Sequence, residues 1–113
     1  MQRGEIVLGS FPFGDTAAAK LRPLLLLTDS VGTGTEVVVA YISSVIPSRL
    51  LLSDILLDKT LPQHQSTRLK VVSGLRLHKI ATIHASALQR YIGFIDPTLQ
   101  QEVDTKLRAV LRL

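Results

Sequence analysis

The stretch Lys20–Leu27, "KLRPLLLL", places two cations directly before a run of leucines. A segment that is apolar at every position is typical of a strand buried on both faces. We therefore expect Pro23–Thr28 to be a central strand of a sheet. The packing of its leucines would hold Arg22 rigidly at the rim of that sheet.

The neighbouring segments also have strand patterns. Glu5–Phe11, "EIVLGSF", is apolar and rich in β-branched residues, and Val37–Ser44, "VVVAYISS", is apolar on both faces until two hydroxyls at its end. The connector "DSVGTGTE", residues 29–36, carries two glycines, and it lies between two strands, which favours a hairpin turn over a nucleotide-binding loop. Strands Pro23–Thr28 and Val37–Ser44 should therefore form an antiparallel hairpin.

The second half of the chain is less uniform. Residues Val45–Arg68 fit a short helix or a strand that enters a polar loop. Leu69–Ile83 returns to a strand pattern, in which Gly74 indicates a bend or a bulge. Ser86–Ile95 is expected to form a short helical turn followed by a last strand.

The chain ends in a predicted amphipathic helix. Asp96 is a good N-cap and Pro97 suits the first helical position. The polar face mixes acidic and basic residues, which favours a helix packed on a sheet over one that lies on a membrane surface. Its apolar positions recur at helical spacing: Leu99, Val103, Leu107, Val110 and Leu111.

Composition limits the function classes. With 113 residues, the chain is expected to be a single domain, 1–113, of α+β class, built on a compact antiparallel sheet or small barrel. It has no cysteine, which excludes disulfides and thiolate zinc sites and fits the cytoplasm. No apolar run approaches the roughly 20 residues of a membrane span, and no signal peptide is evident. The net charge of +4 permits a phosphate-rich partner, although a mild basic excess is common.

No familiar catalytic or metal motif is present. The sequence lacks HExxH, GxxxxGK[ST] and GxSxG, and its carboxylates are scattered. The histidines His64, His78 and His84 do not have the spacing of a ligand cluster, so ordinary structural roles are favoured for them. We therefore expect neither a metal ion nor a cofactor.

The ends of the two hairpin strands supply the best candidate site. The hairpin would bring Arg22 beside Ser43, with Lys20 nearby. A guanidinium next to a hydroxyl can bind a phosphate, because arginine binds it through two donors and stays charged at physiological pH. Without the hairpin, Arg22 would be an ordinary solvated cation at the start of a strand, and Ser43 an ordinary hydroxyl at the end of one. The predicted site therefore depends on the hairpin.

These segments together resemble the MazF/PemK family of toxin endoribonucleases. The resemblance is carried, in order, by "RGEIVLGSFPFGD", "KLRPLLLL", "VVVAYISS", "LRLHKIATI" and "IDPTLQQEVDTKLRAVLRL". It implies an SH3-like small antiparallel β-barrel of the plasmid-maintenance toxin type, with a C-terminal helix. It also implies a homodimer and a cognate antitoxin whose acidic segment covers the RNA-binding groove.

The activity implied by the resemblance is metal-independent cleavage of single-stranded mRNA, which inhibits translation and growth. The ribose 2′-hydroxyl would attack the adjacent phosphate, with Arg22 and Ser43 as the catalytic residues. The resemblance further implies substrate-binding roles for four residues: Phe13, Asp15, Lys20 and Ser44.

Two departures from the family bear on this function. Relatives commonly carry threonine at the position of Ser43, and serine lacks the methyl group that restricts χ1. The loop Thr16–Ala19 is small and largely apolar, where many relatives have polar residues. The alternative is a non-catalytic barrel of the same family that binds an antitoxin or another protein target.

Overall fold

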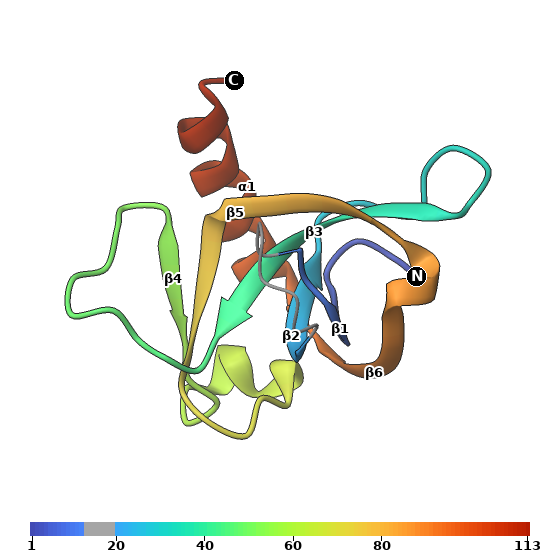
Figure 1. Ribbon diagram of the computed structural model, residues 1–113. Coiled ribbons are helices and arrows are strands. Elements are labelled where there is room, and N and C mark those ends of the chain that lie inside the picture. Colours follow the sequence, from blue (N-terminus) through green and yellow to red (C-terminus); the bar gives the residue numbers. More distant parts are fainter. Residues whose placement is uncertain (13–19) are drawn as a thin grey trace.

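The computed structural model describes residues 1–12 and 20–113, and it contains one antiparallel sheet followed by a helix (Figure 1). The six strands lie in the order β4-β5-β3-β2-β1-β6. The elements are β1 (Glu5–Ser10), β2 (Leu21–Leu26), β3 (Glu36–Ser43), β4 (Asp54–Leu57), the 3-10 helix η1 (Pro62–Thr67), β5 (Ser73–His84), the 3-10 turn η2 (Ala85–Ala87), β6 (Leu88–Phe94) and α1 (Pro97–Leu111).

The predicted central hairpin is confirmed. β2 and β3 are adjacent and antiparallel, in the middle of the sheet. Leu24, Leu25 and Leu26 are fully buried, and they alternate between two apolar clusters on opposite faces of the sheet. This explains why the leucine run lacks polar alternation. In the turn, Gly32 and Gly34 have φ values of 64° and 85°, which glycine adopts without steric cost.

Helix α1 covers one face of the sheet, as predicted. The Asp96 carboxylate accepts a hydrogen bond from the Leu99 N–H at 2.8 Å, and Pro97 occupies the first turn. Leu99 and Val103 are buried in the larger cluster with Leu25. Burial of each such side chain contributes about 1.5–3 kcal/mol. Among the described residues, no helix is long and apolar enough to cross a membrane.

The bulge in β5 lies away from the predicted position. Gly74 pairs regularly with Ser43, whereas the register shifts between Ala40, opposite Ile80, and Tyr41, opposite Arg76. The three residues between Arg76 and Ile80 are therefore extra on the β5 side. Extra residues on one strand bend it, so the bend arises from strand pairing and not from the glycine.

The segment that the sequence left ambiguous forms both a strand and a short helix. β4 pairs with the first half of β5, and η1 follows it. β6 packs closely on η1 at Gly93, where a Cβ would collide with the backbone of Ser66 and Thr67. The edge strands β4 and β6 do not pair with each other in the described part of the chain. The α+β arrangement is confirmed, but the predicted barrel is a bent sheet that is not closed.

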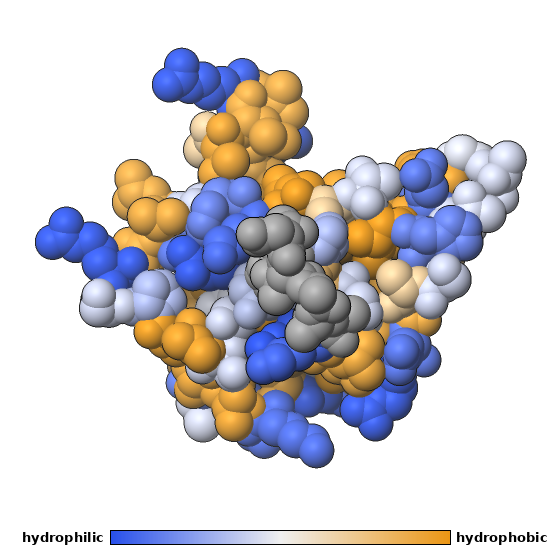
Figure 2. Space-filling view, viewed as in Figure 1, coloured by the Kyte–Doolittle hydropathy of each residue, from blue (hydrophilic) through white to orange (hydrophobic). Residues whose placement is uncertain are grey.

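Many of the exposed apolar side chains lie in two segments, the end of α1 and the loop between β3 and β4. In Figure 2, apolar surface covers the last turns of α1 and the loop between β3 and β4. The Lys106 ammonium joins these two segments by donating to the Leu52 carbonyl at 2.6 Å. The exposed side chains in these segments include Val45, Leu50, Leu51, Leu52, Val110, Leu111 and Leu113.

Candidate functional site

The adjacent ends of β2 and β3 form the candidate site. The observed pairing runs from Leu26 opposite Val39 to Leu24 opposite Tyr41. Continuing this antiparallel register by two residues places Arg22 opposite Ser43. β2 begins at Leu21, two residues before the start expected from the sequence, so Arg22 is part of the strand.

Small residues flank Arg22 across the sheet. Arg22 pairs with Gly9 of β1, and Ser43 pairs with Gly74 of β5. Paired residues point to the same face, so these four form one row, which we call the Arg22 row. A Cβ added to Gly74 would find its nearest neighbour, Arg76 Cδ, only at 3.7 Å. The row is therefore loosely filled next to Ser43 but closely packed at Gly9, where an added Cβ would lie 2.9 Å from the carbonyl oxygen of Ala87.

The Arg22 side chain carries a buried donor without a partner. The residue is half-buried, and its Nε is shielded from solvent but makes no hydrogen bond to any described residue. A buried N–H that lacks an acceptor typically costs about 1–3 kcal/mol. A guanidinium is a permanent cation with five donors in a planar fork, which matches a phosphate or a carboxylate. An anionic ligand would therefore relieve an existing cost at this position.

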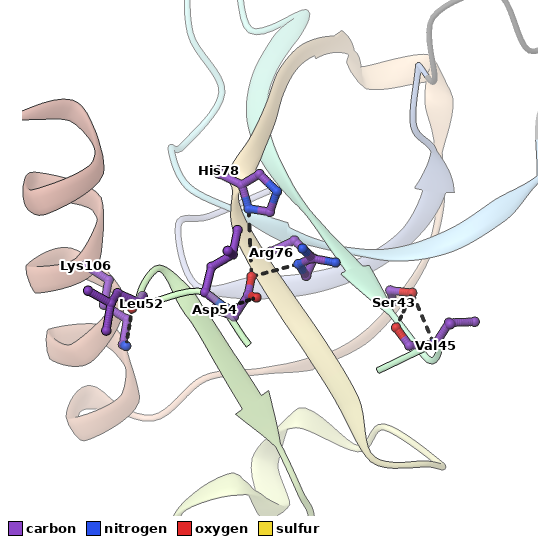
Figure 3. Close-up of polar contacts among 8 residues, drawn as sticks. Ser43, Val45, Leu52, Asp54, Arg76, His78 and Lys106 are labelled. Atoms are coloured by element: carbon purple, nitrogen blue, oxygen red, sulfur yellow. Dashed lines mark hydrogen bonds and ion pairs between the residues drawn. The ribbon is translucent and has the colours of Figure 1, made fainter. Parts of the chain in front are cut away.

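The two serines at the end of β3 have different environments. Ser43 is buried, and its hydroxyl is held by the backbone of Val45, accepting from the N–H at 3.1 Å and donating to the C=O at 3.2 Å (Figure 3). Serine lacks the methyl group of threonine, so its χ1 angle was expected to be free. The two hydrogen bonds to Val45 fix this angle instead. Ser44 is exposed and, with Arg22, lines a cavity of about 260 Å³.

A second arginine is anchored beside the Arg22 row. Arg76 Nε lies 2.7 Å from Oδ1 of Asp54, whose side chain is fully buried (Figure 3). The other oxygen of Asp54 accepts from the Leu51 N–H at 2.8 Å. In Figure 3 the guanidinium of Arg76 extends from β5 over β3, on the side of Asp54 that faces Ser43. Asp54 therefore both orients Arg76 and balances its charge.

His78 lies at the edge of this ion pair. Its Nδ1 is 3.8 Å from Oδ1 of Asp54. Burial and the positive charge of Arg76 lower the pKa of His78 below its ordinary value of 6.5, and Asp54 opposes this shift only in part. The ring is therefore neutral near pH 7, and Asp54 is paired with Arg76.

Sequence reasoning missed Asp54 and Arg76. Asp54 lies in the segment whose structure was ambiguous, and no spacing in the sequence connects it to β5. A signal was present at Arg76, which interrupts the buried residues Leu75 and Leu77. A cation whose side chain is mostly buried within such a strand needs a carboxylate partner nearby.

The remaining predicted site residues are placed as follows. Lys20 is exposed directly before β2 and does not line the cavity. Phe13, Asp15 and the loop Thr16–Ala19 lie outside the described residues.

The histidines have local structural contacts. His64 is buried, and its Nδ1 accepts from the Asp58 N–H at 3.0 Å, which holds the turn after β4. His84 Nδ1 lies 2.8 Å from the Ser86 hydroxyl at the start of η2. Within residues 1–12 and 20–113, no group of three or more His, Cys, Asp or Glu side chains could hold a metal ion.

The fold is shared with several solved toxin structures. The Mycobacterium tuberculosis toxin MazF-mt6 is 22% identical, with a TM-score of 0.73, over 96% of this chain and 97% of that one. An endoribonuclease from a mycobacterial species, solved with its cognate antitoxin, is 16% identical, with a TM-score of 0.72, over 100% and 96%. MazF in the MazE–MazF complex of Deinococcus radiodurans is 16% identical, with a TM-score of 0.73, over 100% and 97%. At these identities the likeness establishes the fold.

The family follows from the sequence. No curated protein matches the chain. The family model described as "PemK-like, MazF-like toxin of type II toxin-antitoxin system" matches residues 2–111, which is nearly the whole length. The chain therefore belongs to the PemK-like and MazF-like toxins of type II toxin–antitoxin systems.

Proposed function

We propose that this toxin is an endoribonuclease that cleaves single-stranded RNA without a metal ion. The observation that carries the proposal is the buried Nε of Arg22, which has no hydrogen-bond partner among the described residues. The register of β2 and β3, continued by two residues, brings Ser43 opposite Arg22. A phosphate of an RNA strand would supply the missing acceptor. The solved relative that is described as an endoribonuclease has the same fold, which supports this reading.

In the proposed reaction, the 2′-hydroxyl loses its proton as its oxygen forms a bond to phosphorus. The bond from phosphorus to the 5′-oxygen breaks, and this oxygen takes up a proton, so the reaction releases no net proton. The products are a 2′,3′-cyclic phosphate and a 5′-hydroxyl. Arg22 stabilises the charge that builds on the phosphorane oxygens. Arginine is a poor base because its guanidinium stays protonated at physiological pH, so we assign it no proton abstraction. Ser43 donates to a phosphate oxygen, which requires its hydroxyl to turn away from the Val45 carbonyl.

Cleavage of a labelled single-stranded RNA in EDTA tests this proposal. Wild type should yield cyclic-phosphate ends, and an all-deoxy strand of the same sequence should stay intact because it lacks the nucleophile. Arg22→Ala and Ser43→Ala should lose cleavage, whereas Lys59→Ala, an exposed cation in the turn after β4, should retain it. Intact RNA with wild type would favour a non-catalytic binding protein, and full cleavage by Arg22→Ala would refute the site assignment.

The proposed partners follow from the same surface. Two relatives of the same fold were solved with their antitoxins. We propose that the antitoxin of this toxin uses an acidic segment, which the net charge of +4 would attract, and that it competes with RNA for the cations around Arg22. The toxin would act as a homodimer in the cytoplasm, where mRNA is found. Light scattering tests the dimer, and loss of RNA binding on addition of the antitoxin tests the competition.

A further inference from the structure

We propose that Lys106 of α1 is a positioning residue for RNA cleavage. It acts through hydrogen bonds that run along the turn Leu51–Asp54, between β3 and β4, to Arg76 beside the Arg22 row (Figure 3). We call this set of contacts the Lys106 network. Lys106 itself lies outside the candidate site. The inference rests on the proposed RNA-cleaving function, and it adds a residue on the helix that keeps one cation of the sheet in place.

Arg76 approaches the Arg22 row on the side of Ser43. Its Cδ lies 3.7 Å from the position that a Cβ of Gly74 would occupy, so the side chain leans along β5 toward Gly74. Gly74 pairs with Ser43, and the strand order β5-β3-β2 places Ser43 between β5 and Arg22. A phosphate bound over Ser43 would therefore have a guanidinium on each side, which favours binding of its charged oxygens.

Asp54 sets the direction of the Arg76 side chain. The Arg76 side chain is only 15% exposed, and the fully buried carboxylate of Asp54 takes its Nε at 2.7 Å. The Nη groups of Arg76 form no hydrogen bond with the residues that the structure describes. They are the donors that remain for a phosphate. A rotation of the Asp54 carboxylate would therefore turn these donors away from the substrate.

The turn Leu51–Asp54 fixes the rotamer of Asp54. The second carboxylate oxygen of Asp54 accepts from the Leu51 N–H at 2.8 Å, and the Asp54 N–H donates to the Leu51 carbonyl at 3.0 Å. Strand pairing with Arg76 fixes the backbone of Asp54, but it leaves χ1 free. The direction of the carboxylate therefore depends on where the turn lies.

Lys106 ties this turn to α1. Its ammonium donates to the Leu52 carbonyl at 2.6 Å, a charge-assisted hydrogen bond in the middle of the turn. The Leu52 side chain is 94% exposed, so its packing does not hold the turn. The helix is a firm support, because Val103 and Leu107 pack in the same apolar cluster as Ile55 of β4. Loss of the Lys106 ammonium would therefore loosen the turn without disturbing the core.

Direct contact of Lys106 with RNA is the alternative explanation for any effect on cleavage. An exposed lysine can bind a phosphate by itself, and its removal then weakens binding and lowers the salt dependence. A residue that only positions a catalytic group instead lowers kcat and leaves KM unchanged. In Figure 3 the turn and Asp54 lie between Lys106 and Arg76, which favours the positioning role.

Cleavage kinetics of a labelled single-stranded RNA in EDTA distinguish these roles. Lys106→Met should lower kcat about fivefold, a size typical of remote residues in a coupled network, with KM and the salt dependence of binding unchanged. Lys106→Arg retains a charged donor for the Leu52 carbonyl and should keep most of the wild-type rate. Arg108→Met removes the same charge from an exposed position of α1 and should change neither kcat nor KM.

A second substitution tests whether the effect passes through Asp54. In an Asp54→Asn background, Lys106→Met should lower kcat no further, because the Lys106 network is already broken there. Circular dichroism shows whether this background is folded. If it is not, the ratio of kcat to KM effects in Lys106→Met and the rescue by Lys106→Arg still decide between the two roles.

NMR of the Arg76 side chain reports its position without RNA. An N–H that a buried carboxylate holds exchanges slowly with water, and loosening of the turn should expose it more often. The Nε–H of Arg76 should therefore exchange faster in Lys106→Met than in wild type. In Arg108→Met and Lys106→Arg the exchange should stay close to the wild-type rate.

The possible outcomes separate this inference from the proposed function. A lower kcat together with faster Nε–H exchange, both restored by Lys106→Arg, supports the inference. Wild-type kcat in Lys106→Met would overturn it and leave the endoribonuclease intact, even if the exchange were faster. A raised KM alone, or an effect that persists in Asp54→Asn, would also overturn it and assign direct RNA contact to Lys106. A wild type that leaves RNA intact would refute both proposals.

Discussion

Replacing Arg22 with methionine should make the free protein more stable while removing its activity. Methionine keeps an unbranched, apolar chain of similar length but has no donor at the position of Nε. Because that Nε is buried and no described residue accepts a hydrogen bond from it, its removal should raise the free energy of unfolding by about 1 kcal/mol. For a domain of this size, such a change raises Tm by about 4 °C.

The same substitution should abolish RNA cleavage. Loss of one donor that stabilises transition-state charge typically costs about 10²–10³ in rate. The measurements are thermal unfolding by circular dichroism and cleavage of a labelled single-stranded RNA in EDTA. Arg108→Met, at an exposed position in the last turn of α1, serves as the control and should change neither value appreciably. A Tm of Arg22→Met that is equal to or below that of wild type would refute the argument that this donor is unsatisfied.

Substitutions at three residues, Ser43, Asp54 and His78, test the polar groups around the site. Ser43→Ala should lower the free energy of unfolding by about 1 kcal/mol in urea titrations, because two backbone groups lose their hydroxyl partner. Ser43→Thr retains a hydroxyl and should leave the free energy of unfolding unchanged. An unchanged value for Ser43→Ala would contradict this reasoning. Asp54→Asn should lower the free energy of unfolding by about 3 kcal/mol, since it leaves the mostly buried Arg76 side chain without a counter-charge. A decrease of less than about 1 kcal/mol is typical of a surface ion pair and would contradict this expectation. His78→Gln tests a pH effect. The pKa of His78 is lowered in the folded state, so the unfolded state binds the proton first, and stability is lost as the pH falls through 6.5. The glutamine variant should therefore lose less stability than wild type between about pH 7 and pH 5, and equal losses would exclude His78 as the cause.

The central hairpin and the final helix could be predicted because their signals are local. The run Leu24–Leu27 shows burial on both faces, the glycines of the connector predict a turn, and Asp96 with Pro97 defines a helix start. Each feature depends on neighbours in the sequence. The order of β2 and β3 in the sheet then follows from the short connector alone.

The features that could not be predicted depend on pairing between distant segments. The bulge in β5 results from the register against β3, and Gly74 gave a misleading local signal. The contact of Asp54 with Arg76 joins residues that are 22 positions apart. Whether the sheet closes depends likewise on whether its two edge strands, β4 and β6, pair with each other. The sequence of neither strand contains a local pattern that predicts this pairing.

Arg76 and Arg22 lie in neighbouring rows of the sheet, and their surroundings differ. In one row, Arg76 is opposite Tyr41 and Asp54, and the buried carboxylate of Asp54 takes up its Nε. In the adjacent Arg22 row, the neighbours are two glycines and Ser43, none of which offers a carboxylate. The sheet thus neutralises the guanidinium of Arg76, whereas the buried Nε of Arg22 has no acceptor within residues 1–12 and 20–113. Stability alone would favour a partner for both, and the anion proposed to bind at Arg22 would supply the missing one.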